Sequence, residues 1–330
     1  MTPNKPEEFR TIILEAAQKY RSICILTHKN PDGDGLCASL FLQEILKNRS
    51  INCDIVLEEP APDVYDFLDG GKRTKVFSNH LIYELLIILD CHEEERIGRC
   101  SPLLHTARQI ITIDHHIERT LIPDAVNYID TQTVSVGAIL YKMLGREMNG
   151  LPPESALYCA KAVYTSIIND TDNFVNANTD SEAFALCSDL MKLGIKPGEI
   201  TEHFLLSKTA DELKYAGEVL SNLETFENGK ILFLVATREM QNRNGLAGKE
   251  ASNLTRWVKG TRGVQIVVSL QEVNKNRFRI SLRSNLIDVN IIAVKYGGGG
   301  HKKASGCEIK GSPEELKNAL LNDIREQMQP

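Results

Sequence analysis

The sequence predicts an α/β protein with a mainly parallel N-terminal sheet that carries helices on both faces, joined by a helical linker to a smaller α/β C-terminal domain. Short apolar runs that fit buried strands alternate with segments of helical periodicity, as in repeated strand–helix–strand units. Several of these runs end directly in a carboxylate or an imidazole, which is expected where parallel strands meet at the edge of an open sheet that carries a site. A chain of 330 residues also exceeds the usual size of one hydrophobic core, so we expect two domains.

Four apolar runs in the first half have the length and composition of buried strands. They cover residues 22–27, 52–57, 85–89 and 109–113. Residues 35–47 instead repeat leucine and isoleucine at helical spacing. The periodicity is helical again from residue 134 to 168, with a break at residues 152–153, where Pro153 suits the first turn of a second helix. This alternation indicates a parallel sheet.

The second half begins with a long helix predicted over residues 209–224 and continues as another α/β pattern. Its expected strands cover residues 230–236, 263–270 and 277–282, and its expected helices cover residues 249–259, 287–295 and 312–327. We therefore expect a catalytic domain at residues 1–190, a helical linker at 191–215 and a substrate-binding domain at 216–330.

Composition excludes several classes of protein. With 42% hydrophobic and 25% charged residues and no apolar run near the roughly 20 residues that span a bilayer, the chain is expected to be a globular protein with no membrane segment. No secretory signal is readable, which predicts a cytoplasmic location. The eight cysteines form no C-x-x-C pair, which argues against a disulfide scaffold or a zinc ribbon. Residues 251–303 hold ten Lys or Arg against two acids, which predicts an anion site, with a solvated basic face as the alternative.

The loop after the first predicted strand carries two carboxylates, Asp32 and Asp34, only two residues apart. Two ionised carboxylates this close in a partly buried site need an opposing charge, which a divalent cation supplies. An Asx-type turn explains the same Asn-Pro-Asp-Gly sequence equally well. His28, at the end of the strand just before the turn, favours the metal site.

More imidazole and carboxylate groups follow other apolar segments. Asp90, Asp114-His115-His116 and Asp170 each stand at the end of such a segment. The predicted metal ligands are therefore His28, Asp32, Asp34, Asp90, His115 and Asp170. Four carboxylates balance the charge of two divalent ions, and mixed His and carboxylate ligation suits Mn²⁺ while tolerating Mg²⁺ or Co²⁺. Two such ions activate water for in-line displacement at phosphorus, which predicts phosphoester hydrolysis.

Asp114 and His116 are predicted to serve catalysis beside Asp90. Asp114 can orient a ligating imidazole, and His116 can hydrogen-bond the scissile phosphate or protonate the leaving oxygen. The alternative is that both residues only support the sheet edge.

These motifs, in this order, resemble the DHH phosphoesterase superfamily, and residues 280–284 and 297–306 resemble the DHH-associated C-terminal domain. The length and the C-terminal type resemble its NrnA-like branch, which degrades very short oligoribonucleotides and removes phosphate from 3′-phosphoadenosine 5′-phosphate. The resemblance implies one Mn²⁺ on His28, Asp32 and Asp90 and another on Asp34, Asp90, His115 and Asp170, with Asp90 bridging. The chain departs from the branch at Asp172, where glycine is usual, and this departure bears on the local pocket shape and the substrate preference.

The C-terminal motif is expected to bind the phosphate of a substrate. Consecutive glycines allow backbone amides to converge on an anion as a nest or a helix start, and a flexible loop is the alternative. Arg283 can grip a phosphate bidentately and His301 can contact a terminal phosphate. The predicted substrate-binding residues are Arg283, Ser284, Gly298, Gly299, Gly300 and His301. Phe174 is a candidate to stack a base, with a core role equally open.

The favoured function is a Mn²⁺-dependent phosphoesterase that acts on RNA of about two to five nucleotides or on 3′-phosphoadenosine 5′-phosphate. Hydrolysis of linear or cyclic dinucleotide messengers is the first alternative, and a pyrophosphatase ranks below it. A nucleotide-binding sensor without turnover is the non-enzymatic alternative, and the complete set of ligands argues against it. The expected partners are short RNA or phosphorylated nucleotides, and a homodimer is compatible with the sequence.

Overall fold

The computed structural model describes residues 5–117, 120–247, 254–258 and 260–328. The chain forms two compact units, Met1–Ser207 and Lys208–Pro330. They meet within the segment 191–215 for which a helical linker is expected. Among the described helices, none combines the length and the apolar character needed to cross a membrane.

The first unit is built on a parallel sheet of six strands in the order β3-β2-β1-β4-β5-β6. The strands are β1 (Ile23–Leu26), β2 (Asp54–Leu57), β3 (Thr74–Val76), β4 (Leu85–Leu89), β5 (Gln109–Asp114) and β6 (Val126–Ile129). β1 lies in the middle, with Ile25 in register with Ile55 of β2 and Ile87 of β4. All the carboxyl ends of the strands therefore meet at one edge of the sheet.

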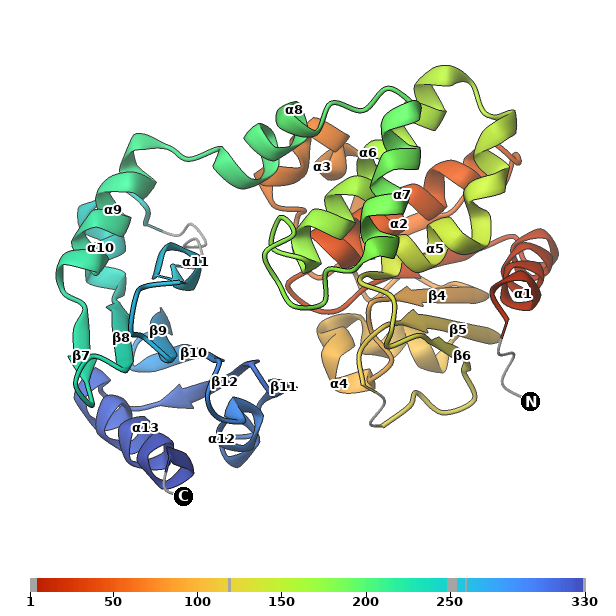
Figure 1. Ribbon diagram of the computed structural model, residues 1–330. Helices are drawn as coiled ribbons and strands as arrows, with labels where there is room; N and C mark the ends of the chain where they lie inside the picture. The colour runs from red at the N-terminus through yellow and green to blue at the C-terminus, as the bar shows by residue number, and fades with distance from the viewer. Residues whose placement is uncertain (1–4, 118–119, 248–253, 259, 329–330) are drawn as a thin grey trace. The chain divides into compact units, whose positions relative to one another are not determined.

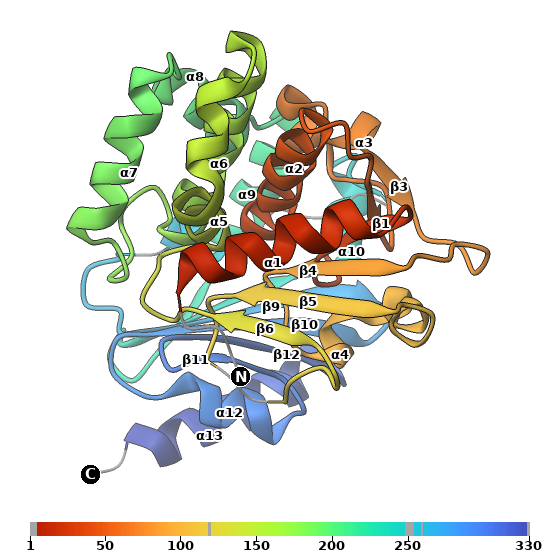
Figure 2. The same ribbon diagram turned by 90° about the vertical axis from the view of Figure 1, so that its right-hand side faces the viewer.

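Helices cover both faces of this sheet, as predicted (Figures 1 and 2). They are α1 (Pro6–Lys19), α2 (Gly33–Lys47), α3 (Gly70–Arg73), α4 (Glu94–Ile97), α5 (Val136–Leu144), α6 (Pro153–Asp170), α7 (Ser181–Lys192) and α8 (Pro197–Thr201), with 3₁₀ segments at Asp63–Leu68, Gly98–His105 and Gly145–Gly150 and a π-helical turn at Glu202–Leu206. Ile23 and Ile25 face the core shared with α1, α2, α5, α6 and α7, whereas Cys24 and Leu26 face the core beneath α4. Because both faces are buried, these strands are continuous apolar runs rather than alternating ones.

The second unit holds a mixed sheet of six strands in the order β11-β12-β10-β9-β8-β7, in which only the β8–β9 pair is parallel. The strands are β7 (Glu224–Phe226), β8 (Ile231–Ala236), β9 (Ile266–Asn274), β10 (Arg277–Ser284), β11 (Gly299–His301) and β12 (Ala304–Lys310). The helices are α9 (Ala210–Ser221), α10 (Arg238–Arg243), α11 (Thr255–Val258), α12 (Val289–Lys295) and α13 (Pro313–Met328). α12 and α13 pack on one face of the sheet, and α9 and α11 pack on β8 and β9 from the other.

The second unit also differs from the sequence prediction in several places. The helix expected over 209–224 ends at Ser221, and the last residue of the expected range, Glu224, begins the edge strand β7. The helix expected over 249–259 is described only as α11, and the rest of that prediction lies outside the described residues. The glycine run does not start a helix: Gly297 and Gly298 follow α12 outside any strand, and Gly299–His301 is the edge strand β11, paired with β12.

Candidate metal centre

The loop between β1 and α2 is both the turn and the carboxylate site that the sequence left as alternatives. Asp32 is the N-cap of α2, and its Oδ1 accepts hydrogen bonds from the backbone N–H groups of Asp34 (2.9 Å) and Gly35 (3.3 Å). The helix begins close against the strand, since a Cβ on Gly35 would lie 2.0 Å from Oγ1 of Thr27. This packing holds Asp34 inside the first helical turn, where it is fully buried.

His28, Asp32 and Asp90 form the first group of candidate ligands. Asp90 follows β4 in a left-handed conformation (φ 58°), and its N–H donates to the carbonyl of Ile113. Nε2 of His28 lies 3.2 Å from Oδ2 of Asp90 and 3.8 Å from Oδ1 of Asp32. Nδ1 of His28 is 2.8 Å from the carbonyl oxygen of Lys29, so it carries the hydrogen and leaves Nε2 as the ligating atom.

Asp34, His115 and Asp170 form the second group. Nε2 of His115 lies 2.9 Å from Oδ2 of Asp170, 3.7 Å from Oδ2 of Asp34 and 3.8 Å from Oδ1 of Asp90. The ring is oriented from behind, because Nδ1 of His115 is 3.2 Å from the carbonyl oxygen of Thr133. As in His28, this leaves Nε2 facing the carboxylates.

The structure thus brings all six predicted ligands into one cluster. Within each of three groups, one candidate ligand atom per residue lies within 4.8 Å of the others: His28 with Asp32 and Asp90, Asp34 with His115 and Asp170, and Asp90 with His115 and His116. Asp90 stands between the imidazoles, as a bridging ligand would. The third group includes His116, whose Nδ1 is already hydrogen-bonded to Asp114.

The electrostatics of the cluster fit bound cations. Burial and the neighbouring carboxylates Asp170 and Asp90 raise the pKa of Asp34 well above its ordinary value. Burial alone would lower the pKa of His115, but the carboxylates of Asp170, Asp34 and Asp90 raise it overall. Oδ1 of Asp90 and Nε2 of His115 are buried without a hydrogen-bond partner among the described residues. A divalent cation would satisfy both atoms and balance the excess negative charge.

Asp34 is held by a cradle that the sequence did not reveal. Its Oδ2 accepts the N–H of Val136 (2.7 Å), and its Oδ1 accepts the N–H of Gly137 (3.0 Å) and the hydroxyl of Ser166 (2.7 Å). Ser166 and Ser135 also share a hydrogen bond of 2.8 Å. Three donors occupy three of the four lone-pair directions of the carboxylate, so one direction on Oδ2 remains for a metal.

Asp114 organises the Asp-His-His motif. Its Oδ1 accepts the N–H groups of His115 (2.7 Å) and His116 (3.1 Å) and the ring Nδ1–H of His116 (2.8 Å). Asp114 thus contacts the ring of His116 and not that of the predicted ligand His115, whose ring is oriented by Thr133. Burial lowers the pKa of His116, but hydrogen bonds to Asp114 and Asp90 outweigh it and raise that pKa to about 9. The raised pKa favours the protonated ring of His116 at neutral pH.

Two residues after β4 belong to this site and were missed from the sequence. His92 is buried (1% exposed), and its Nδ1 donates to Oδ2 of Asp114 at 2.5 Å. Burial lowers the pKa of Arg96, but nearby Asp90 and other anionic groups raise it overall, and the carbonyl of Arg96 accepts the N–H of Lys29. The segment Cys-His-Glu-Glu-Glu-Arg looks like an ordinary charged surface turn, so only the fold reveals that it backs the cluster.

The predicted substrate-binding residues lie together in the second unit. Arg283 of β10 and His301 of β11 are both register partners of Ala304 in β12. Nη1 of Arg283 donates to the carbonyl of Leu282. Oγ of Ser284 accepts the backbone N–H groups of Leu286 and Ile287 in the turn that follows β10. The side chain of His301 lies outside the described residues.

The glycines of this motif are required by close packing between strands. A Cβ on Gly298 would lie 2.1 Å from the carbonyl oxygen of Gly306, and one on Gly300 would lie 2.5 Å from that of Ala304. Gly300 also has a φ of 142°, which disfavours any side chain. The residues expected to form an anion nest therefore have a structural reason to be glycine.

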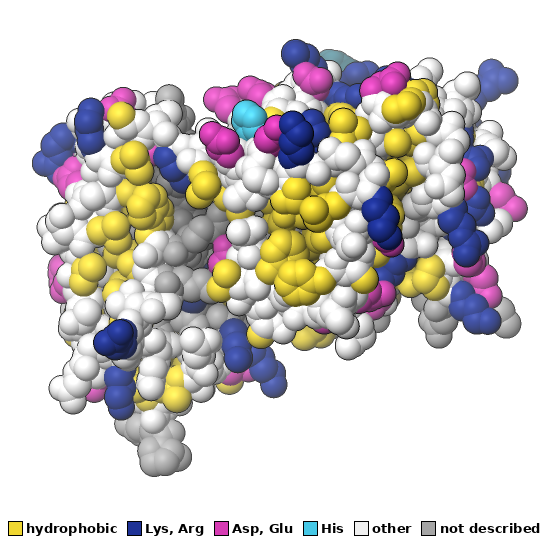
Figure 3. Space-filling model, turned by 45° about the horizontal axis from the view of Figure 1, so that its top comes forward, with side chains coloured by type: hydrophobic (Ala, Val, Ile, Leu, Met, Phe, Trp, Pro, Cys, Tyr) yellow, Lys and Arg dark blue, Asp and Glu magenta, His cyan; other side chains and the backbone are white. Residues whose placement is uncertain are grey.

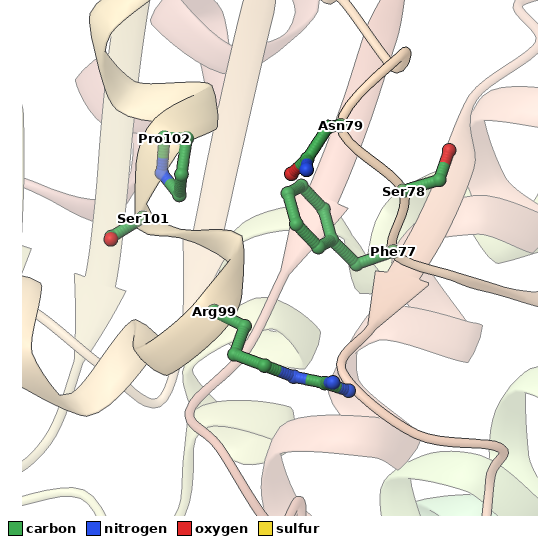
Figure 4. Close-up of a pocket in the computed structure, with 6 residues that line it drawn as sticks. All are labelled: Phe77, Ser78, Asn79, Arg99, Ser101 and Pro102. Carbon is green, nitrogen blue, oxygen red and sulfur yellow. The ribbon is translucent and has the colours of Figure 1, made fainter.

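Two further features lie apart from the cluster. Phe174 stacks on Phe184 with ring centroids 5.0 Å apart and packs against the core, which favours its core role. A hollow of about 430 Å³ in the first unit is lined by Phe77, Ser78, Asn79, Arg99, Ser101 and Pro102 (Figure 4). None of the predicted site residues lines this hollow.

Comparison with known proteins agrees with the motifs. Residues 22–167 match the DHH family, N-terminal domain, and residues 228–329 match the DHHA1 domain. Bifunctional oligoribonuclease and PAP phosphatase NrnA of Mycoplasma genitalium is 26% identical over 91% of this chain and 92% of its own length, and that of Bacillus subtilis is 26% identical over 92% and 93%. The Listeria monocytogenes cyclic-di-AMP phosphodiesterase PdeA is 22% identical over 92% of this chain but only 47% of its own length. The crystal structure of an exopolyphosphatase-related protein from Bacteroides fragilis has the same fold, with a TM-score of 0.86 and 21% identity over 97% of this chain and 96% of that one.

Proposed function

This chain belongs to the DHH family, with a DHHA1 domain in its second half, and is an enzyme that hydrolyses phosphoester bonds; we propose that its substrates are RNA of about two to five nucleotides, 3′-phosphoadenosine 5′-phosphate, or both. The observation that supports this proposal is the pairing of two ligand groups, His28–Asp32–Asp90 and Asp34–His115–Asp170, around the buried carboxylates of Asp34 and Asp90. The names of the relatives that match nearly end to end support the choice of substrate. Cytoplasmic location and a homodimer stay predictions from the sequence.

We propose that the two groups hold two divalent ions, preferably Mn²⁺, with Mg²⁺ or Co²⁺ as substitutes. When bound, such ions polarise a phosphoryl oxygen and acidify a water molecule. Burial and the neighbouring carboxylates raise the pKa of Asp34, and a divalent cation beside Asp34 would favour its ionised form.

The remaining residues position the substrate and move a proton. His116 has Nδ1 fixed by Asp114, so its protonated Nε2 would donate to the scissile phosphate or to the leaving oxygen. In the second unit, Arg283 and His301 lie beside each other across β12, and the guanidinium of Arg283 would bind a phosphate.

Figure 3 shows one face, on which lysine and arginine side chains lie among acidic and apolar ones. Binding of a long strand depends on many phosphate contacts along a band of positive charge, whereas a short RNA or a bisphosphorylated nucleotide needs only a local site.

The test is a direct comparison of substrates with Mn²⁺ present. The 5′-labelled RNA series runs from two to about twenty-four nucleotides, alongside 3′-phosphoadenosine 5′-phosphate and linear and cyclic dinucleotides. We expect turnover of the shortest RNAs and release of phosphate from the bisphosphorylated nucleotide, both abolished in Asp90→Asn. Hydrolysis of dinucleotide messengers alone would instead favour the PdeA-like activity, which the match to that relative makes the second candidate.

A further inference from the structure

We propose that His92 is a positioning residue for this hydrolysis: it fixes the Asp114 carboxylate, and through it the proton-donating ring of His116. The inference rests on the proposed function, since it needs His116 to act on the leaving oxygen. It assigns a role to a residue outside the Asp-His-His motif.

The two oxygens of Asp114 have separate tasks. Oδ1 receives three donors, all from the next two residues: two backbone N–H groups and Nδ1–H of His116. Among the described residues, Oδ2 receives one donor, Nδ1 of His92, at 2.5 Å. Both Asp114 and His92 are buried, at 0% and 1% exposure, so water cannot readily replace the bond. Without His92, the carboxylate could rotate about its Cβ–Cγ bond and lose its alignment with the His116 ring.

The backbone around His92 is itself fixed. The left-handed residue Asp90 turns the chain at the sheet edge, and Cys91 is buried in the core beneath α4. The carbonyl of His92 then accepts the N–H of Ile122 at 3.0 Å. A fixed backbone leaves the imidazole little freedom except toward Asp114.

The burial of a polar imidazole at His92 points to a role for its hydrogen bond to Asp114. Nδ1 must carry a hydrogen because Oδ2 of Asp114 is an acceptor, and Nε2 is buried without a hydrogen-bond partner among the described residues. A residue that only filled space at this position would avoid an unpaired polar atom by being apolar. The remaining reason for an imidazole here is the donor at Nδ1.

A pair of amide variants separates position from size. In His92→Asn, the amide nitrogen occupies the place of Nδ1 and can donate to Asp114, whereas in His92→Gln it reaches the place of Nε2 and leaves Oδ2 unpaired. We expect His92→Gln to lower kcat on a short RNA by about 10–100-fold, the range for residues that orient a reacting group from behind, and His92→Asn to restore most of it. Mn²⁺ affinity should change less than about threefold, because the ligand His115 is oriented by Thr133 and not by Asp114.

The leaving group gives the second readout. Loss of a proton donor slows hydrolysis of a substrate that releases a ribose hydroxyl. It hardly slows hydrolysis of one that releases p-nitrophenolate, because this leaving group needs no protonation. The p-nitrophenyl ester of a 5′-nucleotide should therefore be turned over by His92→Gln at nearly the wild-type rate.

Three results would overturn the inference: wild-type kcat on RNA in His92→Gln, an equal loss on both substrates, or an equal loss in the Asn and Gln variants. If His92→Gln fails to fold, the Asn variant still decides, because it must retain activity on RNA. Asp90→Asn is measured in parallel, since activity in that variant would contradict the proposed function rather than the role of His92.

Discussion

Ser166→Ala should weaken metal binding although Ser166 is not itself a predicted metal ligand. The hydroxyl of Ser166 donates to the buried Oδ1 of Asp34 at 2.7 Å. In the metal-free protein, burial and the neighbouring carboxylates raise the pKa of Asp34, which favours its neutral form, and a hydrogen bond to a neutral carboxyl group is worth about 0.5–1.5 kcal/mol. With cations bound, Asp34 is ionised and the bond is worth about 1.5–3 kcal/mol.

The difference between the two states, about 1 kcal/mol, must appear as lost metal affinity. It corresponds to a rise of roughly 5–10-fold in the Mn²⁺ Kd and, for a unit of this size, to an extra fall in Tm of about 2–4 °C in the presence of the metal. Calorimetric Mn²⁺ titration and thermal unfolding in EDTA and in Mn²⁺ measure both quantities.

The adjacent residue provides the control. Thr165 is equally buried in α6, but its hydroxyl donates only to the backbone carbonyl of Lys161. Thr165→Val should therefore shift Tm equally with and without Mn²⁺. If Ser166→Ala also shifted Tm equally in the two conditions and left the Kd within twofold, Asp34 would not be a ligand held by this cradle.

Four further predictions test separate parts of the structure. Asp90→Asn should lower kcat by several orders of magnitude while the far-UV circular dichroism stays unchanged, because it removes the carboxylate shared between the ligand groups. Arg283→Ala should raise KM for short RNA more than it lowers kcat if the guanidinium grips a distal phosphate. The pKa of His116 is raised from an ordinary 6.5 to about 9, so its protonation stabilises the metal-free fold fully below pH 6.5, and this contribution is lost as the pH rises through about 9. In His116→Gln, the free energy of unfolding measured in urea should therefore fall less over that pH range. Gly298→Ala should destabilise the second unit by about 2–4 kcal/mol in urea unfolding, since its Cβ would strike a backbone oxygen, whereas Gly217→Ala in α9, with open space around it, should stabilise by about 0.5–1 kcal/mol.

Each of these predictions has an opposite outcome. Wild-type turnover in Asp90→Asn would remove the metal cluster from the mechanism. A loss confined to kcat in Arg283→Ala would move that residue to the transition state. An unchanged pH slope in His116→Gln, or a neutral effect of Gly298→Ala, would contradict the hydrogen bonds of Asp114 or the close approach of β11 to β12.

The ligand groups could be predicted from sequence because the signal is local. A carboxylate or imidazole at the end of a buried strand, as at Asp90 and Asp114, has few reasons to be there except at the site edge of a parallel sheet. The unbroken apolar strands predicted the fold class in the same way, since only a sheet covered on both faces buries every residue of its strands.

The supporting residues could not be predicted because their partners are distant in the chain. Ser166 meets Asp34 across 132 residues, and His92 meets Asp114 across 22, with no spacing rule that links either pair. The strand pairing of the glycine run could not be predicted for a related reason. Its glycines allow an anion nest when considered alone, but the carbonyl oxygens of β12 leave no room for side chains, and this neighbour appears only in the fold.

The most direct test is a crystal structure of the protein with Mn²⁺, with the ions located by their anomalous scattering. We expect two peaks, one within about 2.0–2.3 Å of ligand atoms of His28, Asp32 and Asp90 and one at that distance from Asp34, His115 and Asp170, with Asp90 reaching both. Peaks only at other places, or none at a saturating Mn²⁺ concentration, would contradict the proposed two-metal centre.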